Sequence, residues 1–245
     1  MNSGYYAACA GLLASNQSLD IAANNMANMN TTGFRGQTEL FRSLVAQNGG
    51  APMSSLNQAI NDYGVIGGTF MNSAPGHLDE TGNPLDFALE GPGLFSVQTK
   101  AGVRYTRNGS FRVDPDGNLL TSEGDPVLGD QGAIKLPGGT ATVSTDGTIS
   151  VAGAIVARLS LVEADPGALT AEGNTYFQAE AGAAQPANST LVRQGMLEGS
   201  NVEPVTASVN LLNVQRHADL LERTLHVFYS VFDATAVQQL PSVSS

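Results

Sequence analysis

Apolar residues recur with a seven-residue period at both ends of the chain. Near the N-terminus the spacing alternates between three and four residues, and six of the seven positions are apolar: Tyr5, Ala8, Leu12, Ser15, Leu19, Ala22 and Met26. Near the C-terminus the same alternation runs through eight positions, all apolar: Ala207, Leu211, Val214, Ala218, Leu221, Leu225, Phe228 and Phe232. This repeat is typical of a helix that packs one face against another helix. The sequence therefore predicts two long helices, each with an apolar seam that needs a partner.

The flanking residues set the limits of both helices. The first helix is expected to stop near residue 30, because Asn28, Asn30 and Gly33 tolerate the left-handed backbone that ends helices. The second should cover about residues 205–238, since Pro204 stands where a helix entrance accepts proline. More apolar residues of the second helix lie outside its seam: Val209, Leu212, Leu220, Val227 and Val231. A helix with a second apolar stripe is expected to be covered on more than one side.

The middle of the chain alternates short apolar runs with turn residues. Phe87–Leu89, Leu94–Val97 and Ala154–Val162 are the clearest strand candidates. Asn108-Gly109 lies between Val103–Tyr105 and Ser110–Val113 and predicts a hairpin with an exposed polar turn. Such a turn would account for Tyr105, Arg107 and Asn108 without any functional site. Regularly spaced short strands of this kind predict an all-β domain.

These patterns predict an α+β fold, in which terminal heptad helices form a coiled-coil-like assembly domain and an all-β domain is inserted between them. The expected division is a helical assembly domain of residues 1–35 plus 203–240, an extended connecting arm of residues 36–79, a β domain of residues 80–202 and a tail of residues 241–245.

Charge changes this picture in one respect. Only 13% of the residues are charged, about half the usual share, and the net charge is −11. The negative charge argues against binding to a nucleic-acid backbone, which needs a basic patch. A surface so poor in charge suits a protein that its neighbours largely cover. The N-terminus lacks the basic segment and long apolar core of a cleaved signal peptide.

Residues with catalytic or metal-binding potential are scattered. The turn Asp114–Gly117 lacks the later oxygen ligands of a calcium loop, and His77, His217 and His226 form no metal-binding pattern. We therefore expect no catalytic, cofactor-binding or metal site, no cofactor and no small-molecule substrate. Two other interpretations stay open at this point: a secreted β-domain binding protein on a helical stalk, and a hydrolase.

Several stretches resemble the flagellar rod and hook proteins. Residues 21–35 resemble the family's N-terminal signature, and residues 84–95 and 105–111 resemble its β motifs. Residues 195–202 and 209–216 resemble the segment leading into the C-terminal helix and the opening of that helix. The residues that match the family's terminal motifs are Asn24, Asn25, Asn28, Gly33, Phe34, Ser200, Asn201 and Val202.

The resemblance implies a structural subunit of the axial rod, which crosses the periplasm in the flagellar basal body and transmits motor torque. It implies partners as well: further copies of the chain, other rod and hook axial proteins, and the flagellar type III export apparatus, which exports its substrates without a cleaved signal peptide. The form of Leu197–Val202 and the modest length resemble the proximal rod members more than the distal ones.

Overall fold

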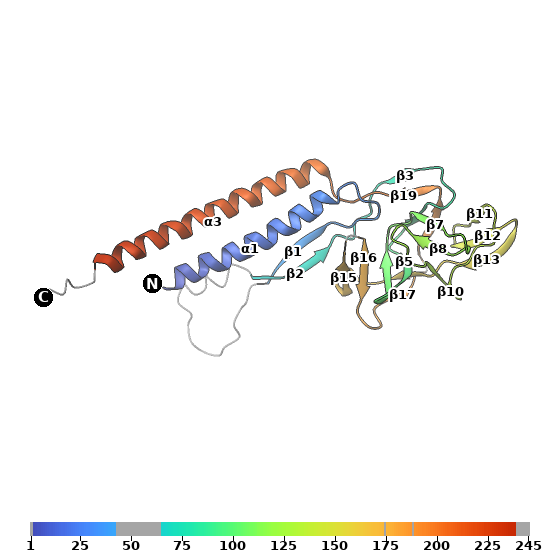
Figure 1. The fold of residues 1–245 in the computed structure, drawn as a ribbon, viewed down its shortest axis with the longest axis horizontal. Helices are drawn as coiled ribbons and strands as arrows, with labels where there is room; N and C mark the ends of the chain where they lie inside the picture. Colours follow the sequence, from blue (N-terminus) through green and yellow to red (C-terminus); the bar gives the residue numbers. More distant parts are fainter. Residues whose placement is uncertain (1, 43–64, 174, 188, 239–245) are drawn as a thin grey trace. The chain divides into compact units, whose positions relative to one another are not determined.

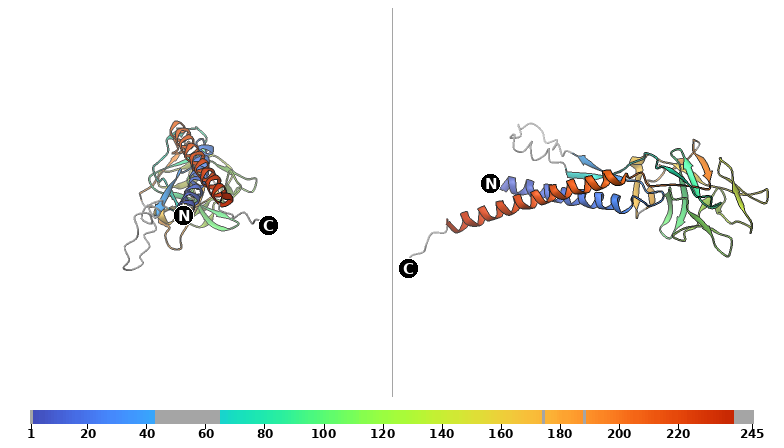
Figure 2. Two further views of the ribbon diagram at one scale, coloured as in Figure 1. Left: turned by 90° about the vertical axis from the view of Figure 1, so that its left-hand side faces the viewer. Right: turned by 90° about the horizontal axis from the view of Figure 1, so that it is seen from above.

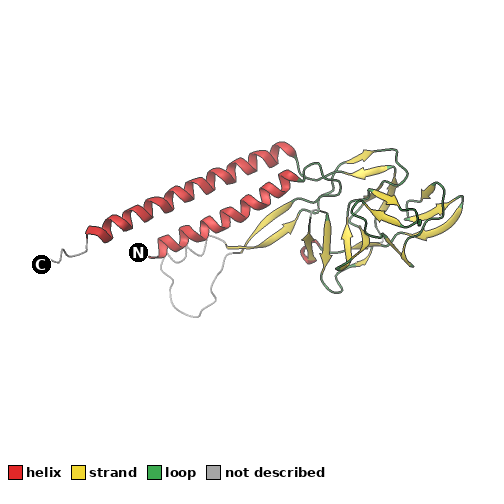
Figure 3. Cartoon of the chain, in the orientation of Figure 1, coloured by secondary structure: helices red, strands yellow, loops and turns green. Residues whose placement is uncertain are grey.

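A computed structural model describes residues 2–42, 65–173, 175–187 and 189–238 of the chain. Along the sequence, helix α1 (Asn2–Ala27) precedes and helix α3 (Pro204–Gln238) follows a middle part made mostly of β-strands (Figures 1 and 3). The predicted α+β class is thereby confirmed. The described residues form two compact units: a helical unit of residues 2–26, 38–42, 65–69 and 205–238, and a β unit of residues 27–37 and 70–204.

In the helical unit, α1 and α3 lie side by side and run in opposite directions (Figures 1 and 2). A Cβ atom added to Gly11 would lie 3.8 Å from both terminal methyl carbons of Leu221, so the helices touch at this point. The described seam side chains are all partly or fully buried: Leu12, Ser15, Leu19, Ala22, Met26, Ala207, Leu211, Val214, Ala218, Leu221 and Leu225. The seam side chains of Tyr5, Ala8, Phe228 and Phe232 lie outside the described ones. No described helix is long and apolar enough to span a membrane.

Strands also occur in the range expected to be an extended arm. Strands β1 (Gln37–Arg42) and β2 (Val65–Met71) form a two-stranded sheet. Residues 43–64, between these two strands, are also part of the predicted arm, and they lie outside the described residues.

The β unit is a set of small antiparallel sheets. The largest has six strands in the order β15-β16-β6-β5-β14-β17, and a three-stranded sheet has the order β11-β12-β13. Four strand pairs complete the unit: β18-β4, β19-β3, β7-β8 and β10-β9. A 3-10 turn, η1 (Pro166–Ala168), precedes β15. The strand bounds are β3 (Leu78–Glu80), β4 (Phe87–Glu90), β5 (Leu94–Thr99), β6 (Gly102–Thr106), β7 (Phe111–Val113), β8 (Leu119–Thr121), β9 (Leu128–Gly129), β10 (Gly132–Ala133), β11 (Ala141–Val143), β12 (Thr148–Val151), β13 (Ala154–Arg158), β14 (Leu161–Glu163), β15 (Leu169–Glu172), β16 (Tyr176–Ala179), β17 (Gln185–Pro186), β18 (Leu191–Gln194) and β19 (Met196–Glu198).

One hydrophobic core holds most of these sheets together. Phe111 packs edge-to-face on Phe87 and Phe95, with ring centroids 5.7 Å and 5.1 Å away. Phe95 and Val97 of β5 are completely buried, and so are Leu119, Val127 and Ile149. Aromatic pairs in this geometry contribute beyond the area they bury. The core gives the β unit a rigid body on which loops can be positioned.

Two local predictions for the β region are wrong. The run Ala154–Val162 is two strands in different sheets, because Leu159 turns into the core and its N–H donates to Gly147 O at 2.9 Å. The hairpin expected around Asn108-Gly109 does not form. Strand β6 pairs with β5 and β16, whereas β7 pairs with β8.

Candidate structural junction

The segment that follows α1 meets the segment that precedes α3 inside the β unit. We call this meeting place, between residues 27–37 and residues 198–204, the junction. The N–H of Gly33 donates to Glu198 O at 2.7 Å, and the N–H of Asn201 donates to Phe34 O at 3.4 Å. Two stretches more than 160 residues apart in the sequence therefore lie against each other, and both carry residues of the family motif.

Gly33 occupies a position that only glycine fits without strain. Its φ is +70°, in the left-handed region that L side chains rarely adopt. A Cβ atom there would also lie 2.5 Å from the carbonyl carbon of Arg107 and overlap the backbone of Asn108. The next residue, Phe34, is 2% exposed and is buried within the same chain. Gly33 thus brings the chain that follows α1 against the loop after β6.

Asn201 connects the junction to the loop after β2. Its side-chain Nδ2 donates to Asn72 O at 2.9 Å and to Ala74 O at 2.8 Å, while its Oδ1 accepts the Gly36 N–H at 2.8 Å. An amide carries both donors and an acceptor, so one asparagine can satisfy backbone groups of two segments at once. No aliphatic side chain could take its place.

The remaining motif residues shape the two connecting segments. Asn28 is buried; its carbonyl accepts the Thr31 N–H at 3.0 Å and its Oδ1 accepts the Thr31 hydroxyl at 3.1 Å, which fixes the turn after α1. Ser200 Oγ accepts the Val202 N–H at 3.2 Å just before α3. Asn24 is exposed and Asn25 half-buried, and both lie in the last turns of α1.

A buried cluster of three charged side chains lies at the centre of the junction. Glu198 is 1% exposed, Arg35 is 4% exposed and Arg107 is 3% exposed. Arg35 Nη2 donates to Glu198 Oε1 at 2.6 Å, and Arg107 Nη1 donates to Glu198 Oε2 at 3.1 Å. The Gly76 N–H also donates to Glu198 Oε1, at 2.9 Å. We call the three side chains Arg35, Arg107 and Glu198 the clasp.

Both guanidinium groups of the clasp also bind backbone carbonyls. Arg107 donates to Leu89 O at 3.1 Å and to Gly91 O, and Arg35 donates to Ala74 O. Burial lowers the pKa of Arg107 to about 10, although the Glu198 charge opposes this shift. Burial also lowers the pKa of Arg35 against the same opposing charge. The clasp thus brings two guanidinium groups and one carboxylate together in the interior, each with hydrogen-bonding partners.

The clasp residues are the ones that reasoning from the sequence missed. Arg107 was expected beside an exposed turn, but the carboxylate of Glu198 draws it into the interior. A signal was present: each of the three lies inside a stretch that resembles the family, in a chain with only 13% charged residues. The seam residues, in contrast, belong to α1 and α3 and take no part in the clasp.

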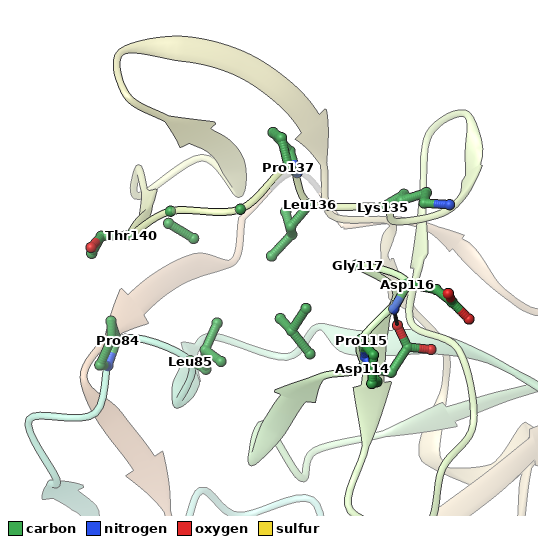
Figure 4. Close-up of a pocket in the computed structure, with 14 residues that line it drawn as sticks. Pro84, Leu85, Asp114, Pro115, Asp116, Gly117, Lys135, Leu136, Pro137 and Thr140 are labelled. Atoms are coloured by element: carbon green, nitrogen blue, oxygen red, sulfur yellow. Dashed lines mark hydrogen bonds between the residues drawn. The ribbon is translucent and has the colours of Figure 1, made fainter.

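The β unit also carries an open hollow of about 820 Å³, formed by residues 84–85, 113–117 and 135–141 (Figure 4). Leu85 and Leu136 line it from opposite sides (Figure 4). At its rim, the hydrogen bond from the Asn118 side-chain amide lowers the pKa of the Asp114 carboxyl group. The backbone N–H groups of Asn118 and Asp116, which donate to the same carboxylate at 2.8 and 2.9 Å, lower this pKa further. Asp114 is thus engaged in closing its own turn. Within the described ranges no three His, Cys, Asp or Glu side chains are grouped to hold a metal ion.

Three segments of the chain match described protein families. Residues 6–35 match the flagella basal body rod protein family, and residues 88–151 match the D1 domain of the flagellar hook protein FlgE/F/G. Residues 193–217 match the C-terminal region of the flagellar basal body rod FlgEFG proteins. The first match includes residues 27–35 of the first junction segment, and the third contains the whole second segment, residues 198–204.

Whole-chain relatives agree with these matches. The flagellar basal-body rod protein FlgF of Caulobacter vibrioides is 36% identical over 226 residues, covering 88% of this chain and 89% of that protein. FlgF of Escherichia coli is 37% identical, covering 91% of this chain and 92% of that protein. FlgG of Agrobacterium fabrum is 31% identical, with 89% and 92% covered. The chain belongs to the flagellar basal-body rod protein family, and it is more similar to these FlgF members than to the FlgG member.

Proposed function

We propose that this chain is a structural subunit of the flagellar basal-body rod, with an assembly role and no catalytic one. In this proposal it is exported by the flagellar type III apparatus without a cleaved signal peptide. It then packs with further copies and with other rod and hook axial proteins in the periplasmic rod, where it helps to transmit motor torque. The relatives named for the basal-body rod, which match along most of its length, support this role.

The observation that carries the assembly role is the outer face of α3, defined here as Val205, Val209, Leu212, Leu220 and Val227. These five side chains are between 51% and 69% exposed. Val205 and the seam residue Val214 are nine positions apart, which places them about half a turn from each other around a helix. Arg216 and Arg223 interrupt the row. α3 is therefore apolar on two sides, and α1 covers one of them.

An apolar stripe of this length is costly to leave in water and marks a surface that a partner covers. Helices with heptad seams supply such partners to one another. We propose that α1 and α3 form a coiled-coil-like assembly domain, in which the outer face of α3 packs on helices of neighbouring subunits.

The test is a double variant, Leu212→Glu with Leu220→Glu, expressed in place of the parent chain in the source bacterium. Glutamate keeps nearly the same helix propensity as leucine, so α3 should persist while its outer face becomes charged. We expect the variant to be exported normally, and we expect loss of swimming and absence of complete rods in purified basal bodies.

Gln215→Glu is the control, because it adds one negative charge, half that of the double variant, at an exposed polar position of α3. It should swim like the parent. Normal rods in the double variant would show that the outer face of α3 is not an assembly surface.

A further inference from the structure

The seam does not specify the register of the helix pair, that is, the position of α1 along α3. A seven-residue repeat permits α1 to shift along α3 by one heptad, about 10 Å at 1.5 Å per residue, and still match apolar with apolar positions. A polar residue at one seam position can fix the register of a helix pair. Here the α3 seam is wholly apolar, and Ser15, the single polar seam position of α1, is buried without a hydrogen bond to its Oγ among the described residues.

The chain segments that lead to the two helices are short and fixed at their far ends. Gly33, whose N–H is bound to Glu198 O, follows the last residue of α1 by six positions. Glu198 itself precedes Pro204, the first residue of α3, by six positions. A hydrogen bond between Asn28 and Thr31 restrains the segment after α1, and one between Ser200 and Val202 restrains the segment before α3.

We propose that the clasp sets the register of α1 on α3. Arg35 lies on the α1 side of the junction, Glu198 on the α3 side, and Arg107 fastens their ion pair to the β unit through Leu89 O and Gly91 O. Because α1 and α3 run in opposite directions, a shift of one heptad would have to stretch one connecting segment and push the other into the junction, which would strain these contacts. Buried ion pairs are weak contributors to net stability, and specifying one geometry is their best-attested use.

The test is disulfide trapping in the free full-length chain, with the native thiol removed by Cys9→Ser. The pair Gly11→Cys with Leu221→Cys reports the native register, because these positions touch. The pair Gly11→Cys with Val214→Cys reports a shift of one heptad. Each pair is oxidised at low protein concentration, and only the intramolecular product is counted. With the clasp intact, the native pair should dominate.

Glu198→Gln should lower the ratio of native to shifted cross-link by about tenfold, since an uncharged amide cannot pair with two guanidinium groups. The matched control is Glu172→Gln, which removes the partner of Arg104 within the same β unit. It should leave the ratio unchanged. Hydrogen exchange of β5 confirms in each variant that the core is intact.

If Glu198→Gln unfolds the core, the ratio of native to shifted cross-link is measured in Arg35→Met instead. This variant leaves Glu198 paired with Arg107 and removes only the ion pair to the segment that follows α1. A ratio unchanged by breaking the clasp, or equal cross-linking of both pairs in the parent, overturns the proposal. Because this ratio is measured in the free chain, it is independent of rod assembly, and the two proposals can fail separately.

Discussion

The junction and the outer face of α3 reverse the usual placement of polar and apolar groups. In the junction, three charged side chains are at most 4% exposed, although only 13% of the residues of this chain are charged. On α3, five aliphatic side chains are more than half exposed. The two regions therefore serve different purposes. A buried ion cluster specifies one geometry within a chain, whereas an exposed apolar stripe is a surface for another chain to cover.

The largest effect should come from removing the carboxylate of the clasp. Glu198→Ala would leave two buried guanidinium groups facing each other without an anion, which costs about 3–5 kcal/mol in comparable buried pairs. The loss should appear as a lower midpoint of urea unfolding of the β unit. Glu172→Ala is the control: its side chain is 48% exposed, so losing its pairing with Arg104 should cost at most about 1 kcal/mol. Equal losses in the two variants would contradict the assigned importance of the clasp.

A smaller effect is expected from adding one methyl group at the junction. Gly33→Ala combines a left-handed backbone with overlap of the Asn108 backbone, and should cost about 2–4 kcal/mol. Gly82→Ala measures the cost of the left-handed backbone alone, since Gly82 has the same φ of +70° and an added Cβ atom would have no neighbour within 4 Å. That variant should cost about 1 kcal/mol. Thermal melts of both variants measure the difference, which is the cost of the close approach alone.

The helices could be predicted from sequence because their signal is local. A seam alternating three and four residues fixes both the helix and the face it buries, and Gly33 and Pro204 limit its extent. The described seam side chains of both helices, Leu12 to Met26 in α1 and Ala207 to Leu225 in α3, are buried or half-buried as that pattern predicts. Strands β4 and β5 could likewise be predicted from short apolar runs.

The errors arose where a distant residue decides the local structure. Arg107 is held by Glu198, 91 positions away, and this contact overrides the hairpin signal of Asn108-Gly109. Leu159 leaves its apolar run because the core accepts it. At the junction, Gly33, Phe34 and Asn201 could be named from their resemblance to a motif. Their partners could not, because sequence spacing gives no information about which loops meet.

A modest stabilisation is expected where α1 meets α3. Gly11→Ala removes a glycine from a helix interior, which is worth about 1 kcal/mol, and the new methyl would lie at an ordinary contact distance of 3.8 Å from Leu221. The helical circular dichroism signal should melt at a higher temperature. Lowered helicity would mean that the two helices approach more closely at Gly11 than the structure shows.

The smallest effect should come from the outer face of α3, and two adjacent leucines test it. Leu220 is 61% exposed, whereas Leu221 is half-buried and faces Gly11. Because no described neighbour buries Leu220, Leu220→Glu should change the stability of the free chain by no more than about 0.5 kcal/mol. Leu221→Glu places the same carboxylate in the seam, where burial without a partner costs about 1–3 kcal/mol or more. Urea unfolding followed by helical circular dichroism, at concentrations where the parent is monomeric, measures both variants. Equal losses would mean that the free chain already covers its outer face, and the contrast between a junction completed within the chain and a helix surface left for neighbouring chains would then fail.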